Sequence, residues 1–551
     1  MGSLLTPEDV FGELLRIRGL TGEDRTAFIS PSYDAMRHDP YLLPDMQQAV
    51  GRLIIAKAAS ELVYIYGDYD IDGLSATTIL FEAFTAFGFR VKTFIPNRFH
   101  DGYGLSGPAI KRLADEGATL LVTVDCGSLS HKEIAYAREI GVDVIVTDHH
   151  SVGETMPAAV ATINPKRTGH SYPFCDLAGC GVAFKLVQAL QQQLEGLPVG
   201  QEKWMLDLVA LGTVCDIVGL VDENRANVYW GLQVLAKTRR PGIKALAAVA
   251  GLDLKQLNAR SLGFVVGPHL NAAGRLETAQ LSLDLLTAQD GVKALAVAET
   301  LRDMNQARRT EQDRIFKEAA VQAALYANDL VLVLSDSSWS HGIIGIVAAK
   351  ILETFHKPTF ILQEIGNESK GSARSFGDFS AVDGIHAAEQ WLTRGGGHKL
   401  AAGVSLKTEN ISRFRQEINE FYRSLNLENQ DRFLEPQADL MLDNLAPLNL
   451  QLISLLQQLE PYGHGNREPI LAVTNLRIVE RKDMGSDKQH LKLHLADGDN
   501  RHLAVVGFNQ SKQVMAQAGD RVDVWLQLTE NEWRGSRSAE GRLLKVVFSE
   551  L

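Results

Sequence analysis

Aspartate and histidine side chains follow three short apolar runs in the first half of the chain, and a fourth apolar segment adds one more aspartate. They are Asp68, Asp70, Asp72, Asp125, His149, His150 and Asp216. Carboxylate oxygens and imidazole nitrogens suit Mn²⁺ or Mg²⁺, whereas a structural zinc site would use thiolates. Two such ions about 3.5–4 Å apart clamp a phosphate and lower the pKa of a bridging water. These residue types therefore point to hydrolysis of a phosphoester.

The stretch "DYDIDG", which begins at Asp68, also has the spacing of the start of a calcium-binding EF-hand loop. An EF-hand needs helices on both sides and a bidentate glutamate at position twelve. Position twelve here is Ile79, and the preceding "ELVYIY" is rich in β-branched and aromatic residues, as in a buried strand. The sequence thus excludes an EF-hand.

An aspartate that follows a strand is often only the N-cap of the next helix. That explanation suffices for any one of these turns. Three such turns on successive strands, one of them with two histidines, favour a shared site. Asp216, near the end of the helix-like "WMLDLVALGTVCDIVGL", also fits a helix cap or a buried ion pair, and Asp207 in the same segment is assigned to structure.

Short apolar runs alternate with helix-like segments between residues 50 and about 225. "ELVYIY" precedes the first acidic turn, "TLLVTV" precedes Asp125, and "VDVIVT" precedes "DHH". Continuous apolar strands that alternate with helices predict an α/β fold with a parallel, doubly wound sheet covered on both faces. Ligands of such sheets gather beyond the carboxyl ends of the strands, where all three acidic turns fall.

The pattern of apolar and polar residues divides the chain into five segments. Residues 1–48 are predicted to be helical and peripheral, residues 49–285 form the first α/β domain, and residues 286–328 form a connecting helix. A second, smaller α/β domain is expected over 329–430, with glycine-rich turns at "KGSARSFGDFS" and "GGGHKLAAG". Short alternating strands over 436–551 predict a small β-barrel of OB-like fold.

Composition and charge are those of an ordinary globular protein. The 551 residues suggest about three domains, with 45% hydrophobic and 22% charged residues. The net charge of −12 argues only weakly against a nucleic-acid substrate, because a local basic channel can lie within an acidic protein. The lack of a long apolar run or a signal peptide favours the cytoplasm. The four cysteines form no CxxC pair and are expected to be free, buried thiols.

Eight motifs in order resemble those of the DHH/DHHA1 phosphoesterase superfamily. "GDYDIDG", "VTVDCG", "VTDHHS" and "GTVCDIVGL" resemble the four motifs of the DHH domain. "GPHLNAAGRL", "SWSHGIIGIVAAKI", "KGSARS" and "GGGHKLAAG" resemble the DHHA1 domain. The segments "HDPYLLPDM" and "LEPYGHGNREPIL" extend the likeness to the bacterial single-strand-specific exonucleases of this superfamily and over essentially the whole chain.

The resemblance implies a metal-dependent exonuclease that degrades single-stranded DNA from 5′ to 3′ and releases 5′-mononucleotides in recombination and repair. It also implies single-stranded-DNA-binding protein and a RecQ-type helicase as partners. By this resemblance one ion is held by Asp70 and Asp125 with Asp68 and His150. The other is held by Asp72, Asp125, His149 and Asp216, with Asp125 bridging. Asp68 also fits a role in which it contacts the ligands and does not bind an ion itself.

The same resemblance assigns residues that contact the DNA phosphates. His398 in "GGGHK" corresponds to the histidine that DHHA1 domains aim at the scissile phosphate, among glycines that let the backbone approach closely. The other positions are Arg98, Arg275, His341, Ser372 and Arg374. An arginine offers a bidentate fork to phosphate but is more often a surface ion-pair partner, and His341 equally fits a helix cap. One departure is His269, where the family usually has a basic residue.

The predicted barrel offers aromatic and basic side chains for a single strand. The aromatic set is Tyr462, Phe508, Trp525 and Trp533, and the basic set is Arg477, Arg481, Lys482 and Lys488. Stacking and an electrostatic rim are the functional interpretations. Core packing is the simpler explanation for most of the aromatic residues, and a solvated face for the basic ones.

Two other functions compete with the exonuclease. Other DHH enzymes cleave short RNAs, cyclic dinucleotides or pyrophosphate, but they normally lack an OB-like tail, which favours a long polymer as the substrate here. An inactive scaffold in a replication complex is the second alternative. Such a scaffold should have lost acids of the metal site, whereas all of them are present in this sequence.

Overall fold

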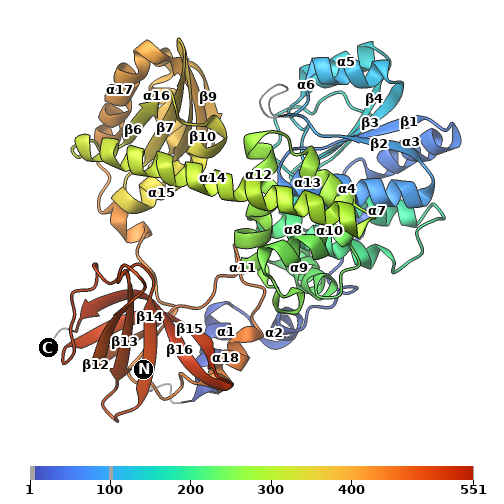
Figure 1. Ribbon diagram of the computed structural model, residues 1–551. Helices are drawn as coiled ribbons and strands as arrows, with labels where there is room; N and C mark the ends of the chain where they lie inside the picture. Colours follow the sequence, from blue (N-terminus) through green and yellow to red (C-terminus); the bar gives the residue numbers. More distant parts are fainter. Residues whose placement is uncertain (1–5, 98–103, 550–551) are drawn as a thin grey trace.

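The computed structural model describes residues 6–97 and 104–549 of the chain. Two α/β units and a β-barrel are arranged around the long helix α14 (Gly291–Leu325), which runs between the α/β units (Figure 1). Its buried residue Leu301 belongs to the core of the first unit, and Ile315 belongs to the core of the second. The predicted connecting helix is therefore present, and it packs on both units.

The first unit is built on a five-stranded parallel sheet in the order β2-β1-β3-β4-β5. Its strands are β1 (Leu62–Tyr66), β2 (Arg90–Phe94), β3 (Ala118–Val124), β4 (Asp143–Thr147) and β5 (Ala161–Ile163). Alternate side chains of β1 enter two separate cores, Val63 on one face and Tyr64 on the other. Burial on both faces explains the continuous apolar strands, and the predicted doubly wound sheet is confirmed.

Helices cover both faces of this sheet. The helices of this unit are α3 (Met46–Ala58), α4 (Ile71–Phe87), α5 (Gly107–Asp115), α6 (His131–Glu139), α7 (Gly179–Gln191), α8 (Leu206–Cys215), α9 (Asp222–Leu235), α10 (Pro241–Ala250), α11 (Ala259–Ser261), α12 (Gly267–Leu276) and α13 (Gln280–Thr287). The helix after β1, α4, packs in the same core as α3 and α7, whereas the helix after β3, α6, packs with α5 on the opposite face. The sheet therefore reverses its winding between β1 and β3, and such a switch point opens a crevice for ligands.

The second unit has a mixed five-stranded sheet in the order β6-β7-β8-β10-β9. Its strands are β6 (Leu332–Asp336), β7 (Thr359–Ile365), β8 (Glu368–Arg374), β9 (Leu392–Gly397) and β10 (Ala401–Lys407), and its helices are α15 (His341–Phe355), α16 (Ala381–Ala387) and α17 (Ile411–Ser424). Only β6 and β7 pair in parallel, and the remaining pairs are antiparallel.

The two glycine-rich segments were predicted as turns, and this prediction is wrong for residues 370–374 of the first and for 395–397 and 401–403 of the second, which lie in strands. Gly371 lies in β8 and Gly395 in β9. A Cβ on Gly371 would lie 2.7 Å from Leu362 Cδ2, and one on Gly395 would lie 2.6 Å from Ile385 Cγ2. Glycine is required here because neighbouring side chains pack directly on the backbone of the strands.

The carboxy-terminal part is a closed barrel of five strands, as predicted. They are β12 (Leu471–Met484), β13 (His490–Ala496), β14 (His502–Gly507), β15 (Arg521–Trp533) and β16 (Ser536–Phe548). Pairing of β12 with β15 closes the barrel. The short strand β11 (Leu440–Leu442) adds to β12, and helix α18 (Leu450–Gln457) packs on the same core.

The amino-terminal segment is helical, with α1 (Pro7–Ile17) and α2 (Gly22–Ile29), but the prediction that it is peripheral is wrong. Val10, Phe11 and Leu14 are buried in the core of the barrel. Figure 1 shows α1 beside α18, more than 400 residues away in the sequence. The apolar face of α1 completes a core that the barrel strands leave open on one side.

The cysteines are free, and the prediction of buried thiols holds for Cys126 and Cys180. Cys175 is exposed and Cys215 is half-buried, so the prediction is wrong for Cys175. Among the residues that the structure describes, no helix is both long and apolar enough to cross a bilayer.

Truncation of Leu14 tests the role of α1. Leu14→Ala removes a side chain that is 1% exposed in the barrel core, so the free energy of unfolding of the barrel should fall by about 2–5 kcal/mol. Ile17→Ala, at a position 46% exposed on the same helix, should change it by less than about 0.5 kcal/mol. Urea unfolding followed by tryptophan fluorescence compares the two variants, and equal effects would contradict the packing described here.

Candidate metal centre

The first acidic turn lies between β1 and α4 and is fixed by backbone hydrogen bonds. Asp70 is the N-cap of α4, and its Oδ1 accepts a hydrogen bond from the Gly73 N–H at 3.1 Å. Asp72, in the first turn of α4, accepts from the N–H groups of Gly179 at 2.6 Å and Cys180 at 2.8 Å, at the start of α7. Two helix amino termini thus face this turn and favour negative charge there.

Asp125 follows β3 in a left-handed backbone conformation, with φ of +61°. This conformation is unfavourable for a residue with a side chain, and such strain gathers at functional sites. A Cβ on Gly179 would lie 2.7 Å from Asp125 Oδ1, so α7 can approach the carboxylate this closely only with glycine at that position. The backbone therefore directs this carboxylate into the switch point.

The two histidines after β4 are oriented by Asp148. Its Oδ1 accepts from the backbone N–H of His149 at 2.8 Å and of His150 at 3.1 Å, and it lies 2.8 Å from His150 Nδ1. Its Oδ2 accepts from the Ser128 N–H at 2.9 Å. Because Nδ1 of His150 is held by this carboxylate, Nε2 is the nitrogen available to a metal.

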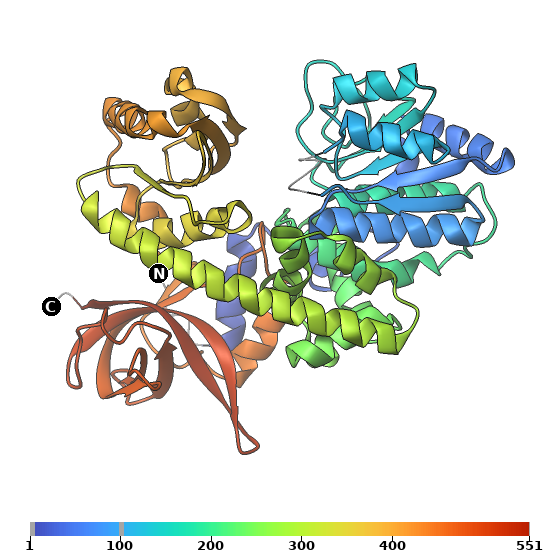
Figure 2. The same cartoon turned by 45° about the horizontal axis from the view of Figure 1, so that its top comes forward.

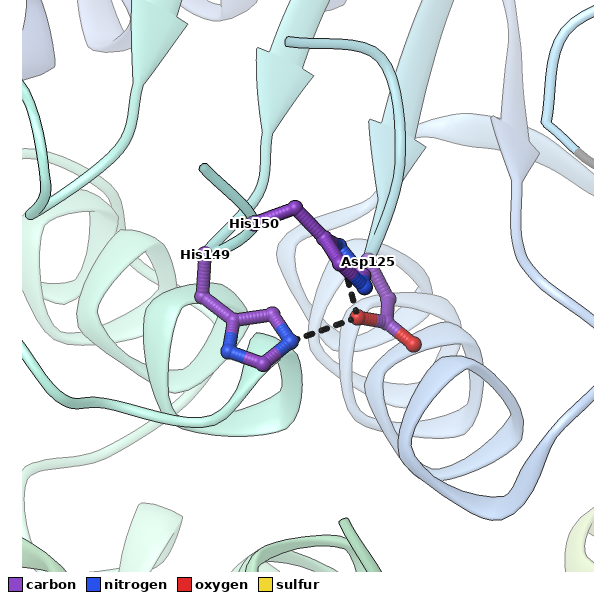
Figure 3. Close-up of side chains that lie close together, drawn as sticks. All are labelled: Asp125, His149 and His150. Atoms are coloured by element: carbon purple, nitrogen blue, oxygen red, sulfur yellow. Dashed lines mark ion pairs between the residues drawn. The ribbon is translucent and has the colours of Figure 1, made fainter. Parts of the chain in front are cut away.

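The acids and histidines of the four segments converge on one place. His149 Nε2 lies 3.1 Å from Asp125 Oδ1, 3.5 Å from Asp216 Oδ2 and 3.8 Å from Asp72 Oδ2. Figure 3 shows His149 and His150 reaching Asp125 from the same side, with His150 Nδ1 at 3.8 Å from its Oδ1.

The ligand atoms form three overlapping groups. Within each group the atoms lie within 4.8 Å of one another, and each group contains residues from more than one segment. The groups are Asp68–Asp70–Asp125, Asp72–His149–Asp216 and Asp125–His149–His150. Asp125 and His149 each belong to two of them. Asp216 is positioned as the C-cap of α8.

Burial makes this cluster unstable without cations. Burial, followed by the charge of Asp72, raises the pKa of Asp70, Asp125 and Asp216, for Asp216 to about 8. Burial lowers the pKa of His149, which keeps this imidazole neutral and able to ligate. Burial alone would also lower the pKa of His150, but the hydrogen bond and charge of Asp148 raise it to about 9.

Buried atoms that make no hydrogen bond show that the donor set suits divalent ions. Among the described residues, Asp125 Oδ1 and both ring nitrogens of His149 are buried without a hydrogen-bond partner. Such atoms are costly unless they bind something that the protein itself does not supply. Oxygen and imidazole donors without thiolate fit Mn²⁺ or Mg²⁺.

Four of the predicted phosphate contacts meet around the start of α15. Arg275 donates to the Gly342 carbonyl at 3.1 Å. A Cβ on Gly345 would lie 3.0 Å from Ser372 Oγ and 3.2 Å from Arg374 Nη2. His341 is the first residue of α15, and its backbone N–H donates to Gln363 Oε1 at 3.0 Å.

Arg374 has the environment of an anion-binding residue. Burial lowers the pKa of Arg374, and its Nη1 donates to Ser372 Oγ at 3.1 Å. Within the described part of the chain it forms no ion pair with a carboxylate. A half-buried guanidinium beside a helix amino terminus favours a phosphate.

The structure does not place two of the predicted phosphate-contacting residues in this group. His398 lies in the exposed turn between β9 and β10, where its N–H donates to the Ala401 carbonyl at 2.8 Å. Arg98 lies outside the described residues. His269 directs its Nδ1 to the Val265 carbonyl at 2.7 Å, within its own helical segment.

The barrel candidates divide between structure and surface. Tyr462 donates its hydroxyl to the Leu456 carbonyl at 2.5 Å and packs against the core, and Trp525 is half-buried. Phe508 and Trp533 are 59% and 69% exposed. Arg481 donates to three backbone carbonyls. It is therefore neither part of an electrostatic rim for a bound strand nor part of a solvated face.

The remaining basic candidates of the barrel, Arg477, Lys482 and Lys488, are exposed. Asp207 is 2.8 Å from Arg240, as expected of a structural residue.

Sequence reasoning missed two residues that position the site. Asp148 could have been found, because an acid directly before two histidines at a strand end can reach their backbone N–H groups. Gly179 carried no signal, since only the packed structure shows that its missing side chain makes room for Asp125.

Family models match three parts of the chain. The DHH family, N-terminal domain matches residues 62–213, the DHHA1 domain matches residues 328–424, and the RecJ OB domain matches residues 439–544. The parallel sheet with its acidic switch point and the two following parts thus define a metal-dependent phosphoesterase of the DHH class.

Similar proteins and solved structures indicate which family within this class the chain resembles. The single-stranded-DNA-specific exonuclease RecJ of Dickeya dadantii is 35% identical over 525 residues, which are 91% of this chain and 90% of the relative. RecJ of Escherichia coli is 33% identical over 526 residues, 90% of this chain and 89% of the relative. The crystal structure of Thermus thermophilus RecJ with Mn²⁺ has a TM-score of 0.83 and 30% identity, and covers 98% of this chain and 76% of its own. The corresponding Mg²⁺ complex has a TM-score of 0.78 at 28% identity, with coverage of 98% and 75%.

The chain belongs to the RecJ family of exonucleases, and it is a hydrolytic nuclease that uses Mn²⁺ or Mg²⁺.

Metal-free stability should depend on pH through the buried carboxyl groups. A carboxyl group whose pKa is raised in the folded state keeps a proton that unfolding releases. Metal-free protein should therefore lose stability as the pH rises from about 4, the unfolded value. The loss should level off near the pKa of about 8 that Asp216 has in the folded state. Asp125→Asn should raise the Tm in EDTA at pH 8, by about 2–4 °C for each kcal/mol of repulsion removed.

In saturating Mn²⁺ the wild-type protein should instead have a higher Tm than Asp125→Asn, because the ions bind the deprotonated acids of the wild type. Differential scanning fluorimetry with and without EDTA measures both trends. A wild-type Tm in EDTA that rises steadily from pH 5 to pH 8 would contradict the described repulsion.

Proposed function

We propose that this protein is an exonuclease that degrades single-stranded DNA from 5′ to 3′, releases 5′-mononucleotides and acts in recombination and repair. One observation carries the proposal. The ligand groups that share Asp125 stand next to a cavity of about 920 Å³ that reaches the barrel. Ile71, between Asp70 and Asp72, and Ile217, after Asp216, line its catalytic end. The relatives are named for single-stranded DNA, and their substrate is proposed for this chain.

The walls of the cavity come from all parts of the molecule. Asn271 belongs to α12, Arg308 to α14, and Gln527 and Arg542 to the barrel strands. A substrate of one or two nucleotides needs no wall from the barrel, whereas a longer strand would contact the barrel while its end lies at the metal centre. The arrangement therefore favours a polymer over the short substrates of other DHH enzymes. Convergence of every predicted acid disfavours an inactive scaffold.

The residues have distinct proposed roles. Bound divalent ions would activate water and neutralise charge on the phosphate. We assign Asp70 and Asp125, with Asp68 and His150, to one ion. Asp72, Asp125, His149 and Asp216 are assigned to the other.

Arg275, His341, Ser372 and Arg374 would bind phosphate oxygens at the start of α15, and Arg98 and His398 are proposed for the same role. The Asp148 carboxylate would keep the proton of His150 on Nδ1 and so hold Nε2 toward the metal.

End-labelled strands test polarity and product. In Mn²⁺, a 40-nucleotide single strand labelled at its 5′ end should release labelled mononucleotide at once. The same strand labelled at its 3′ end should shorten progressively and keep its label. A blunt duplex should remain intact. Asp72→Ala should lower kcat by at least about a thousandfold, since it removes a ligand that two backbone N–H groups hold in place. Release that begins at the 3′ end would contradict the polarity, and cleavage confined to dinucleotides would indicate a small-substrate enzyme.

A charge-removing variant tests the anion site at α15. Arg374→Ala should raise KM for single strands about ten- to a hundredfold, because charge-assisted hydrogen bonds to a phosphate are lost. Arg423→Ala, at an exposed position in the last turn of α17, is the matched control and should change KM less than twofold. Steady-state kinetics on one 5′-phosphorylated strand compares them. Equal KM values for Arg374→Ala and the wild type would remove Arg374 from the binding site.

The finer assignments are part of the same proposal. Single-stranded-DNA-binding protein and a RecQ-type helicase are proposed as partners, and the cytoplasm as the location. The proposed domains are a DHH domain over 49–285, the connecting helix over 286–328, a DHHA1 domain over 329–430 and the OB domain over 436–551. The helical segment 1–48 is proposed to serve the OB domain through α1.

A further inference from the structure

Ile217 has two unfavourable features at once. Its φ is +62°, a left-handed conformation that is a marked outlier for a β-branched residue. Its side chain is 70% exposed, although isoleucine is usually buried. The residue follows Asp216 directly, at the point where α8 ends. Neither packing nor backbone preference accounts for an isoleucine here.

Hydrogen bonds on both sides hold the strained backbone. The Asp216 N–H donates to the Gly212 carbonyl at 2.9 Å, and the Ile217 N–H donates to the Val214 carbonyl at 3.3 Å. Beyond it, the Leu220 N–H donates to the His464 carbonyl at 2.8 Å. The segment is thus fixed between the catalytic sheet and the barrel, and strain of this kind persists only where the surroundings determine the backbone.

A second exposed apolar residue stands on the neighbouring element. Phe264 is 76% exposed and lies in a π-helical turn over Leu262–Val266, a rare conformation that is frequent at functional sites. The two elements touch, because a Cβ on Gly263 would lie 3.7 Å from Val214 Cγ1. The Arg260 guanidinium lies 5.5 Å from the centre of the Phe264 ring.

Both side chains line the same cavity beside the metal centre. Ile217 and Phe264 are on the wall formed by the catalytic unit, and Gln527, Thr529 and Arg542 are on the wall formed by the barrel. Figure 2 shows the barrel facing the α8–α12 region of the first unit below α14. Ile217 and Phe264 thus form an exposed apolar patch on a wall that also carries Arg260, and the facing wall carries Arg542, which is paired with Glu468 at 3.0 Å.

We propose that Ile217 and Phe264 form an apolar platform against which the bases of the bound strand lie, and that this contact positions the terminal phosphodiester at the metals. The inference rests on the proposed function and adds residues to it. Apolar side chains without hydrogen-bonding groups accept any base, as a nuclease without sequence preference requires. Arg260 beneath the ring adds a cation–π contribution.

Removal of the base and removal of the side chain together test this platform. Ile217→Gly keeps the backbone, because glycine adopts the left-handed region freely, so its Tm should equal or exceed that of the wild type. With a 40-nucleotide strand in Mn²⁺, Ile217→Gly and Phe264→Ala should each raise KM about five- to a hundredfold. An abasic residue at one of the first four positions should raise KM of the wild type by a similar factor and leave the variants almost unchanged.

His356→Gly is the matched control. This residue also has positive φ, +54°, but it is the C-cap of α15 and does not line the cavity. The variant should relieve backbone strain and leave KM and the abasic penalty unchanged.

The outcomes separate the two proposals. Wild-type protein that hydrolyses no strand would overturn the proposed exonuclease and the platform with it. Normal hydrolysis with equal abasic penalties in the wild type, Ile217→Gly and Phe264→Ala would overturn the platform alone. A reduced penalty in both variants, at unchanged Tm for Ile217→Gly, is the result expected of direct contact with the bases.

Discussion

Mutual repulsion among buried carboxylates is the constraint on which this structure depends. Asp72 and Asp125 are each 1% exposed and share one small volume with Asp70 and Asp216. Burial and the neighbouring charges raise the pKa of Asp125 well above its usual range. An ordinary globular protein would replace such a cluster by apolar residues, so its presence is explained by divalent cations that neutralise it. The ring nitrogens of His149, which are buried without a hydrogen-bond partner, have the same explanation.

The fold provides the means to hold this charge in place. Reversal of winding between β1 and β3 opens the crevice, and the amino termini of α4 and α7 supply N–H groups to Asp70 and Asp72. The left-handed backbone of Asp125 and the missing side chain of Gly179 bring the Asp125 carboxylate into the crevice. The barrel lines the cavity that lies beside this crevice. There the side chain of Arg225 is buried and donates to the carbonyls of Phe28, Leu459 and Glu460, which joins the catalytic unit to the barrel and the amino-terminal segment.

Local chemistry explains which features the sequence predicted. Apolar runs with acids at their ends are local patterns, and parallel strands bring those ends together. The convergence of the acids and histidines, the doubly wound sheet and the barrel strands could therefore be predicted. Packing between distant segments could not, and this is why α1 was taken as peripheral and the glycines of β8 and β9 as turns. Arg481 was ambiguous for the same reason, because its carbonyl partners lie about thirty residues away. The φ of Ile217 has no signature in the sequence, since β-branched residues are expected to avoid it.

The number and position of bound ions test the account most directly. Crystals soaked in Mn²⁺ and measured by anomalous diffraction at the manganese edge should show two ions about 3.5–4 Å apart with Asp125 between them. One ion should contact Asp70, and the other should contact His149 and Asp216. A single ion, or a pair in which Asp125 contacts neither, would contradict the view that the buried carboxylates form a two-metal centre.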